Sequence, residues 1–176
     1  IYRTDRYLPH DIALYDIRPV REEAHARFSA TSRTYRYYVT LRKDPFQEAR
    51  MLRLYFPLDF DRMNEAAERL KDFTDFTSFS KLHTDVKTNN CRVTEAYWQA
   101  GAEEGQWIFT ITADRFLRNM VRAVVGTLFQ VGKGRLSVED FCEVIEAKDR
   151  GQAGSSAPAH ALYLEQVGYP EDLYLD

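Results

Sequence analysis

The fold is constrained most by two alternating segments, residues 92–100 and 106–113, which the short sequence Gly-Ala-Glu-Glu-Gly separates. Alternation of apolar and polar residues is typical of a strand with one buried face, and a short Gly-containing loop joins neighbouring antiparallel strands. The pair therefore predicts a β-hairpin, and with it a sheet that contains antiparallel pairing. No strand–helix–strand alternation accompanies the hairpin, so a parallel, doubly wound sheet is disfavoured.

A further strand is predicted for residues 33–41, which are rich in Tyr, Thr, Val and Leu. Alternation assigns to one face Arg33, Tyr35, Tyr37 and Val39, and to the other Thr34, Arg36 and Tyr38. Residues 25–32 before it are small, polar and basic, as in a loop that contacts a ligand. Two interpretations stay open: an ordinary strand with packed tyrosines, or an aromatic platform with basic flanks of the kind that holds single-stranded nucleic acid.

Residues 115–131 have the clearest helical period of the chain. Their apolar side chains occupy a wide arc, so we expect a nearly buried helix that ends at Gly132 and Gly134. The narrow polar face of this helix is expected to carry Arg115, Arg118, Asn119 and Arg122.

The remaining elements are predicted from helix caps, alternation and chain breakers. Helices should run from the N-cap Asp59 to about Lys71, and onward from Ser137, which forms a capping-box pattern with Asp140. Strands are expected over 11–20, 50–56 and 161–169, and a flexible loop over 150–160. About six strands and three helices favour an α+β fold, with a largely antiparallel sheet and helices packed mainly on one face.

The length of 176 residues is that of a single domain, and we expect one domain over residues 1–176. Membrane-span, signal-peptide, phosphate-loop and metal-ligand patterns are missing, and the four His are scattered. No metal or cofactor is therefore predicted. Cys91 and Cys142 are expected to be reduced thiols, which together with the missing spans favours a cytoplasmic protein without membrane contact.

Charge is segregated along the chain. The net charge of −3 argues against nucleic-acid binding when taken alone. However, residues 18–53 contain nine Lys and Arg against four Asp and Glu, and residues 115–136 contain five against none. Acidic residues gather in 59–75, in 139–149 and at the C-terminus. One basic face is therefore expected, and the field at such a face attracts phosphates whatever the net charge. The polar loop 81–90, with His83 and Lys87, is either solvated or a further phosphate contact.

Six motifs occur in one order along the chain: Leu8-Pro-His-Asp-Ile12, His25-Ala-Arg-Phe-Ser-Ala-Thr-Ser-Arg-Thr-Tyr-Arg-Tyr37, Asp75-Phe-Thr-Ser-Phe79, Phe116-Leu-Arg-Asn-Met-Val-Arg-Ala-Val-Val-Gly126, Ala147-Lys-Asp-Arg150 and Ala157-Pro-x-His-Ala-Leu-Tyr-Leu164. Together they closely resemble the C-terminal two-thirds of TruA-type tRNA pseudouridine synthases. The resemblance covers essentially all 176 residues.

The resemblance implies an enzyme that isomerises uridine in the anticodon stem-loop of tRNA, as a homodimer and without a cofactor. It implies a fold in which two related α+β halves join their sheets around a basic cleft. By motif, Tyr35 stacks on the flipped uracil and Arg122 pairs with the essential Asp. The residues expected to bind RNA are His25, Arg27, Arg33, Arg36, Arg115 and Arg118.

The catalytic Asp of the family lies in Gly-Arg-Thr-Asp-Ala-Gly-Val-His, and this motif does not occur in the chain. Arg3-Thr4-Asp5 matches three of its residues, but Arg6-Tyr7-Leu8-Pro9 follows where Ala-Gly-Val-His is required, so Asp5 receives no catalytic role. We therefore expect the C-terminal domain of a larger enzyme, inactive without its N-terminal half. Two alternatives stay open: a non-catalytic RNA-binding module, and a structural or protein-interaction domain without an RNA role.

Overall fold

The computed structural model describes residues 2–81 and 88–175. Two compact units make up the chain, a larger one over Thr31–Gly168 and a smaller one formed by Ile1–Ala30 with Tyr169–Asp176. The smaller unit contains the short helix α1 (Tyr2–Asp5) and the 3₁₀ turn η4 (Glu171–Leu173).

The strand predicted over residues 11–20 is wrong. Only Val20 pairs at all, in an isolated antiparallel bridge with Tyr174. The apolar side chains that produced the alternation are exposed, with 53% of Ile12, 88% of Tyr15 and 67% of Ile17 accessible. A strand needs a partner ladder and a surface on which to bury one face, and alternation in the sequence supplies neither.

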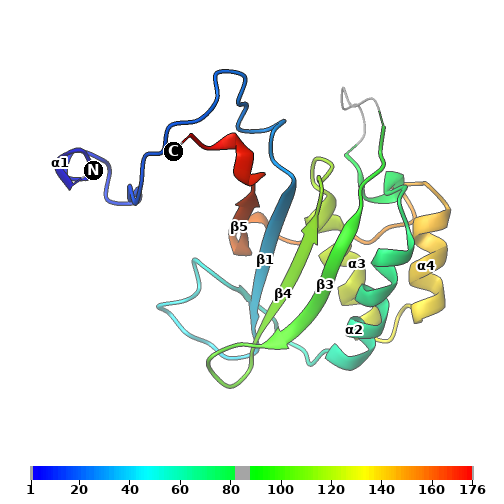
Figure 1. Ribbon diagram of the computed structural model, residues 1–176. Helices are drawn as coiled ribbons and strands as arrows, with labels where there is room; N and C mark the ends of the chain where they lie inside the picture. Colours follow the sequence, from blue (N-terminus) through cyan, green and yellow to red (C-terminus); the bar gives the residue numbers. More distant parts are fainter. Residues whose placement is uncertain (1, 82–87, 176) are drawn as a thin grey trace. The chain divides into compact units, whose positions relative to one another are not determined.

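The larger unit is built on a five-stranded sheet with β1 (Ser32–Thr40) near its centre (Figure 1). On one side β1 pairs antiparallel with β4 (Gln106–Ala113), which pairs in turn with β3 (Val93–Ala100). On its other side β1 pairs antiparallel with β5 (Leu162–Gly168), and its end pairs parallel with the two-residue strand β2 (Leu52–Arg53). The predicted hairpin and the strands at 33–41 and 161–169 are thus confirmed, whereas the strand expected over 50–56 is reduced to two residues.

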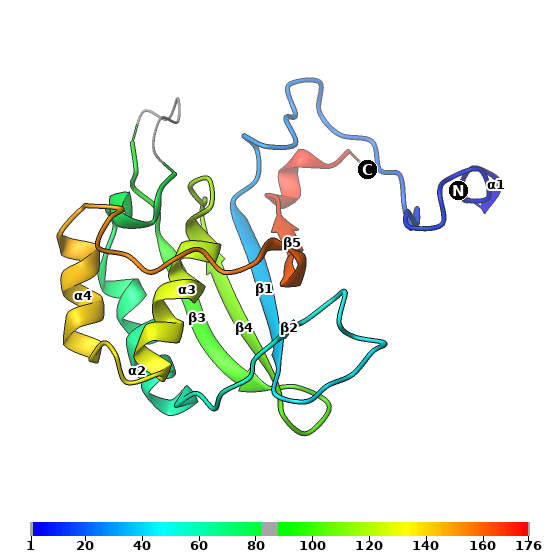
Figure 2. The same ribbon diagram turned by 180° about the vertical axis from the view of Figure 1, so that it is seen from behind.

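Three helices cover one face of this sheet: α2 (Phe60–Arg69), α3 (Met120–Gly132) and α4 (Val138–Glu146) (Figures 1 and 2). Asp59 caps α2 by accepting from the amide of Arg62 at 3.0 Å, and Ser137 caps α4 in a full capping box with Asp140. The buried side chains of the helices pack on the sheet in a single core. The α+β class with helices on one face is confirmed.

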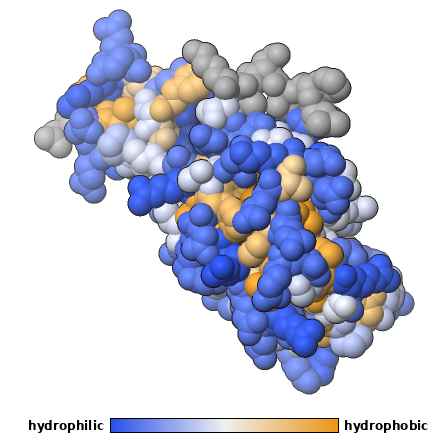
Figure 3. Space-filling view, turned by 90° about the vertical axis from the view of Figure 1, so that its right-hand side faces the viewer, coloured by the Kyte–Doolittle hydropathy of each residue, from blue (hydrophilic) through white to orange (hydrophobic). Residues whose placement is uncertain are grey.

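The outer surfaces of α2 and α4 are hydrophilic. Figure 3 views the side of the molecule on which these helices lie and shows hydrophobic side chains only in patches among hydrophilic ones. The exposed residues of α4 include Glu139, Asp140, Glu143 and Glu146. The acidic residues of α4 therefore lie on the outer helical surface, away from the sheet.

The start of α3 differs from the prediction, because the helix begins at Met120 and not at residue 115. Asn119 adopts the left-handed conformation, with φ 71°, and a single residue of this kind breaks a right-handed helix. Arg115, Arg118 and Arg122 consequently do not form one ridge on one helix. Leu117 and Met120 are nonetheless both buried. The apolar spacing therefore continues across the start of the helix, and the spacing alone does not show where the helix begins.

Candidate functional site

Tyr35 lies on the helix-covered face of β1, as the alternation predicts. Tyr37 and Val39, at the next positions on this face, are fully buried, and Tyr35 is half-buried. The ring of Tyr35 meets the ring of Phe116 edge to face, with centroids 5.2 Å apart and planes at 89°. Phe116 comes from the segment between β4 and α3, so the non-helical path of that segment gives Tyr35 its aromatic neighbour.

Tyr35 and Phe116 line an open pocket of about 840 Å³. Residues of β1, β5, the segment before α3, the first turn of α3 and the segment after α4 contribute to its walls. Its positively charged residues are Lys81, Arg118, Arg122 and Arg150, and no Asp or Glu of the described chain lines it. The pocket therefore joins aromatic surface to a positive field, which is suited to a planar ligand that carries negative charge.

Arg122, in the first turn of α3, is anchored at one side of its guanidinium. Its Nε donates to the backbone oxygen of Ala157 at 2.6 Å, and its own backbone oxygen accepts from the amide of Ala157 at 2.9 Å. Within residues 2–81 and 88–175, no Asp or Glu forms an ion pair with Arg122, and its terminal nitrogens form no hydrogen bond. A cation placed in this way can receive a carboxylate or phosphate from a ligand or from another segment.

Tyr37 lies next to Arg122 but has a different environment. Its hydroxyl donates to the backbone oxygen of Pro158 at 2.9 Å. Burial raises the pKa of Tyr37 well above the ordinary value of tyrosine, and the positive charge of Arg122 opposes this only in part. Tyr37 is therefore a neutral phenol whose polar end is already satisfied, so we assign it to the support of the pocket.

The residues between α4 and β5 cross over α3 before they enter the sheet (Figure 2). Their composition predicts a flexible loop, but the segment is held by hydrogen bonds from one end to the other. Gly154 donates to the Thr127 hydroxyl at 3.0 Å, and Asn119 Nδ2 donates to the Ser156 hydroxyl at 2.6 Å. The segment is a loop, as its composition predicts, and its small residues allow close backbone contact with the helix.

The predicted RNA-binding arginines of the larger unit do not all surround the pocket. Arg118 lines it, and Arg115 Nη1 donates to the backbone oxygen of Thr88 at 3.3 Å. Arg33 donates to the backbone oxygen of Asp114 at 2.6 Å. Arg36 follows Tyr35 in β1 and therefore lies on the opposite, helix-free face of the sheet. There it pairs with Glu165 at 2.8 Å. The single basic face expected from the sequence therefore does not include Arg36.

His25 and Arg27 belong to the smaller unit, and their RNA-binding role stays a prediction. His25 Nδ1 accepts from the amides of Arg27 and Phe28, at 3.0 and 3.3 Å. Asp5 belongs to the same unit, is exposed and accepts from the amide of Leu14 at 2.8 Å. Of the polar loop, His83 and Lys87 lie outside the described residues.

Sequence reasoning missed Lys81, Phe116, Arg150 and Ser156 as pocket residues. Phe116 and Arg150 belong to motifs that carry the family resemblance, so the motifs could have indicated them. Nothing in the local pattern marks Lys81. It reaches the pocket because its amide donates to the backbone oxygen of Arg118 at 3.1 Å, a contact between segments far apart in sequence.

Among the residues that the structure describes, no three His, Cys, Asp or Glu side chains are grouped to hold a metal ion. None of the described helices is long and apolar enough to cross a bilayer. Cys91 is buried, and burial raises the pKa of its thiol to about 11. This thiol is therefore protonated near neutral pH and is a poor nucleophile.

Comparison with known proteins gives consistent relationships. A family model described as tRNA pseudouridine synthase matches residues 66–170. The chain is 66% identical over 173 residues to a tRNA pseudouridine synthase A of Porphyromonas gingivalis, covering 98% of this chain and 69% of that relative. It is 57% identical to the protein of the same name from Bacteroides thetaiotaomicron, over 98% of this chain and 64% of the relative. The corresponding protein of Bacillus subtilis is 38% identical over 96% of this chain and 68% of its own length.

Proposed function

Because the chain belongs to the tRNA pseudouridine synthase family, we propose that it is the C-terminal domain of a larger isomerase. The reaction converts uridine to pseudouridine in the anticodon stem-loop of tRNA. The observation that carries the proposal is the pocket itself, in which the ring of Tyr35 and the guanidinium of Arg122 line one cavity without an acidic residue of the described chain.

Tyr35 contributes an aromatic surface for the target base. An enzyme that acts on a base in structured RNA must take the base out of its stack, and an aromatic ring recovers part of the lost stacking energy. The edge-to-face contact with Phe116 limits the orientations that the Tyr35 ring can adopt. In the proposed complex the uracil lies against this ring, inside the pocket.

Arg122 contributes the positive charge that keeps a catalytic carboxylate ionised. An opposite charge within about 4–6 Å lowers the pKa of a carboxyl group and so maintains its reactive form at neutral pH. The family motif that carries the Asp does not occur in the 176 residues. We propose that an N-terminal half of the same enzyme supplies this Asp, so that these 176 residues alone do not catalyse the reaction.

Binding of the stem-loop involves the arginines and the histidine predicted from the sequence, together with Lys81 of the pocket. Lys81 and Arg118 are exposed pocket residues, and Arg115 precedes Arg118 in the same segment. Arg33, Arg36, His25 and Arg27 complete the proposed RNA contacts. A homodimer in the cytoplasm, with no cofactor, metal ion or membrane contact, completes the proposal for the whole enzyme.

The decisive experiment measures release of tritium from tRNA that contains [5-³H]uridine. The 176-residue chain is assayed alone and joined to the N-terminal half from a reading frame that encodes the Gly-Arg-Thr-Asp-Ala-Gly motif. We expect no release from the chain alone and release from the joined enzyme, abolished by Asp→Asn in that motif. Release by the chain alone contradicts the half-site proposal. Tight RNA binding without release by the joined enzyme would favour the non-catalytic module.

A further inference from the structure

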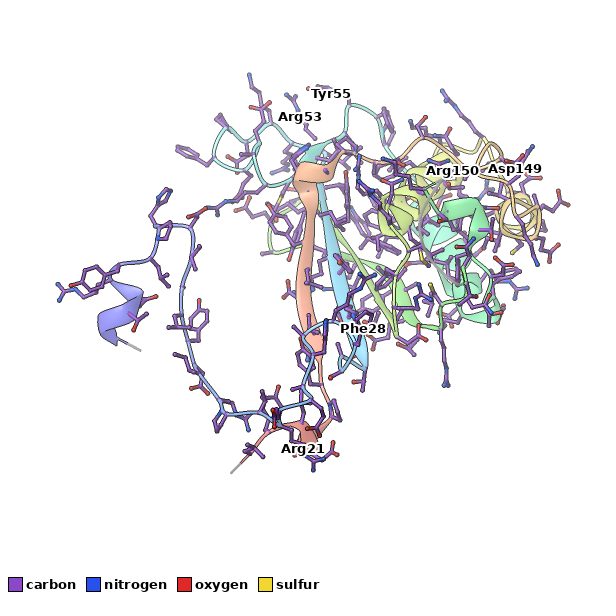
Figure 4. All side chains as sticks on the ribbon, turned by 90° about the horizontal axis from the view of Figure 1, so that it is seen from above. Arg21, Phe28, Arg53, Tyr55, Asp149 and Arg150 are labelled. Carbon is purple, nitrogen blue, oxygen red and sulfur yellow. The ribbon has the colours of Figure 1, made fainter. Side chains whose placement is uncertain are left out.

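Arg150 lies just after α4, next to Asp149, at the start of the segment that crosses α3 (Figure 4). Arg150 is half-buried, and the donors of its guanidinium point back into its own segment. Nη1 donates to the backbone oxygens of Ala153 and Gly154, at 3.4 and 3.2 Å, and Nη2 donates to the Ser156 hydroxyl at 3.0 Å. One planar fork thus fixes three acceptors within a segment that has no regular secondary structure.

The Ser156 hydroxyl joins this fork to the start of α3. It accepts from Asn119 Nδ2 at 2.6 Å as well as from Arg150. Asn119 is the residue with φ 71° that precedes the helix, and Asn tolerates this conformation better than other non-glycine residues. The hydroxyl therefore connects the segment after α4 with the residue that sets where α3 begins.

Ala157, the next residue, exchanges two hydrogen bonds with Arg122. Its amide donates to the backbone oxygen of Arg122, and its own oxygen accepts from Arg122 Nε at 2.6 Å. The carbonyl of Ala157 is the only hydrogen-bond acceptor that the guanidinium of Arg122 has among the described residues. The position of this one carbonyl consequently sets the direction of the guanidinium in the pocket.

The segment also lies unusually close to α3. A Cβ atom added to Gly126 would lie 1.8 Å from the backbone oxygen of Ser155, and one added to Gly154 would lie 2.9 Å from the backbone oxygen of Gly126. Contact at this distance leaves the segment little room to slide along the helix. Arg150 adds a second restraint, because it also holds the carbonyls of Ala153 and Gly154 and the hydroxyl of Ser156.

From these contacts we infer that Arg150 is a positioning residue, which acts through Ser156 and Asn119 to fix the Ala157 carbonyl and so to direct Arg122 into the pocket. Arg suits this task better than Lys, because a planar fork can hold acceptors in several fixed directions, whereas an ammonium group is a point charge. The geometric part of the inference concerns this chain alone, and its catalytic consequence rests on the role proposed for Arg122.

The first test follows the Nε–H of Arg122 by ¹⁵N NMR of the 176-residue chain. Because this proton is bonded to Ala157, we expect slow exchange with solvent in the parent and exchange about tenfold faster or more in Arg150→Gln. Ser156→Ala removes only one hydroxyl and should also accelerate exchange. This variant carries the test if Arg150→Gln fails to fold. Arg135→Gln, at an exposed arginine on a different segment, is the matched control and should match the parent.

The double variant Arg150→Gln/Ser156→Ala tests whether the two residues act along one route. If they do, its exchange rate should equal that of the stronger single variant, since coupled residues are not additive. Arg150→Lys should fall between the parent and Arg150→Gln. Exchange at the parental rate in a folded Arg150→Gln chain overturns the inference. If Arg150→Gln does not fold, exchange at the parental rate in Ser156→Ala overturns it.

The second test uses the enzyme joined to its N-terminal half. Arg150→Gln should lower kcat while leaving KM for tRNA within about twofold, and Arg150→Lys should recover part of kcat, as expected for a misaligned catalytic group. Arg122→Gln is measured beside it. If Arg122→Gln keeps parental kcat, the role proposed for Arg122 fails although the NMR result stands. If Arg122→Gln loses kcat and a folded Arg150→Gln enzyme does not, the positioning role fails alone.

Discussion

Tyr35 and Tyr37 lie two residues apart on the same face of β1, but their hydroxyl groups have different surroundings. The hydroxyl of Tyr37 is bonded to Pro158, and its ring is fully buried. No described residue forms a hydrogen bond with the hydroxyl of Tyr35, and its ring lines the pocket. Of the two, only Tyr35 offers both a ring surface and a hydroxyl to a ligand.

Substitution of Tyr35 can separate these two contributions in the joined enzyme. Tyr35→Phe keeps the ring and Tyr35→Leu removes it. If the ring only stacks, Phe should retain most activity and Leu should lose about 1–3 kcal/mol of base binding. If the hydroxyl transfers a proton, Phe should lose about 100-fold in rate while RNA still binds. Single-turnover rates and RNA affinity measure the two effects, and parental behaviour of both variants would make Tyr35 a packing residue.

The contacts of Asp75 make the folding stability depend on pH, and they fix the sign of that dependence. Its carboxylate accepts from the Thr77 hydroxyl at 2.6 Å and pairs with Lys148 at 3.0 Å. The hydrogen bond from Thr77, followed by the contacts with Lys148 and the Thr77 amide, lowers the pKa of Asp75 below its ordinary value of 3.8, although burial opposes this. The contribution of Asp75 to folding stability is therefore complete at pH values above its ordinary pKa, and it is lost as the pH falls through the lowered pKa.

The free energy of unfolding of Asp75→Asn, measured against pH, checks this expectation. The difference between parent and variant should be constant from about pH 7 to pH 5 and should shrink below about pH 4. A difference that grows on acidification would show that the pKa of Asp75 is raised, contrary to the contacts.

At the scale of elements, the sequence predicts those helices, strands and caps that depend on residues close together along the chain. The hairpin, β1, α2 and the cap of α4 each carry a local signal, and the structure has all four. The true start of α3 depends on the left-handed Asn119, and the loss of the strand at 11–20 depends on a missing partner ladder. The sequence assigned Tyr35 and Arg122 by motif. It could not show the bonds from Lys81 to Arg118 and from Asn119 to Ser156, because these join distant segments.

Gly126 is the residue in α3 that allows the crossing segment to lie on the helix. Gly126→Ala should lower the free energy of unfolding by about 1–3 kcal/mol, because the added Cβ would overlap a backbone oxygen that no side-chain movement can clear. Gly151→Ala is a matched control, since its Cβ would meet only the Asp149 side chain at 3.2 Å. Chemical denaturation of both variants measures the difference. Equal stabilities would show that the segment is free to move away from α3.

At the scale of the whole molecule, charge is distributed by element. The exposed residues of α4 are largely acidic, whereas the charged residues that line the pocket are all basic in the described chain. A net charge of −3 averages these two regions and so describes neither. Association with RNA responds to the local field, because each neutralised phosphate releases a counterion and makes binding depend on salt.

The salt dependence of binding to an anticodon stem-loop RNA can count these contacts. Arg118→Gln should weaken binding and reduce the slope of log K against log salt by about 0.7–0.9, as expected for one lost phosphate contact. Arg69→Gln is the control, because this arginine lies on α2 and pairs with Asp72. It should leave the slope unchanged.

Arg36→Gln completes the series, because Arg36 lies on the helix-free face of the sheet and is paired with Glu165. A reduced slope for this variant would mean that RNA reaches both faces of the sheet, as the sequence-based assignment of Arg36 requires. A parental slope for Arg36→Gln with a reduced slope for Arg118→Gln would confine the RNA to the pocket side. A parental slope for both would show that neither arginine contacts a phosphate, and the basic pocket would then need another anionic ligand.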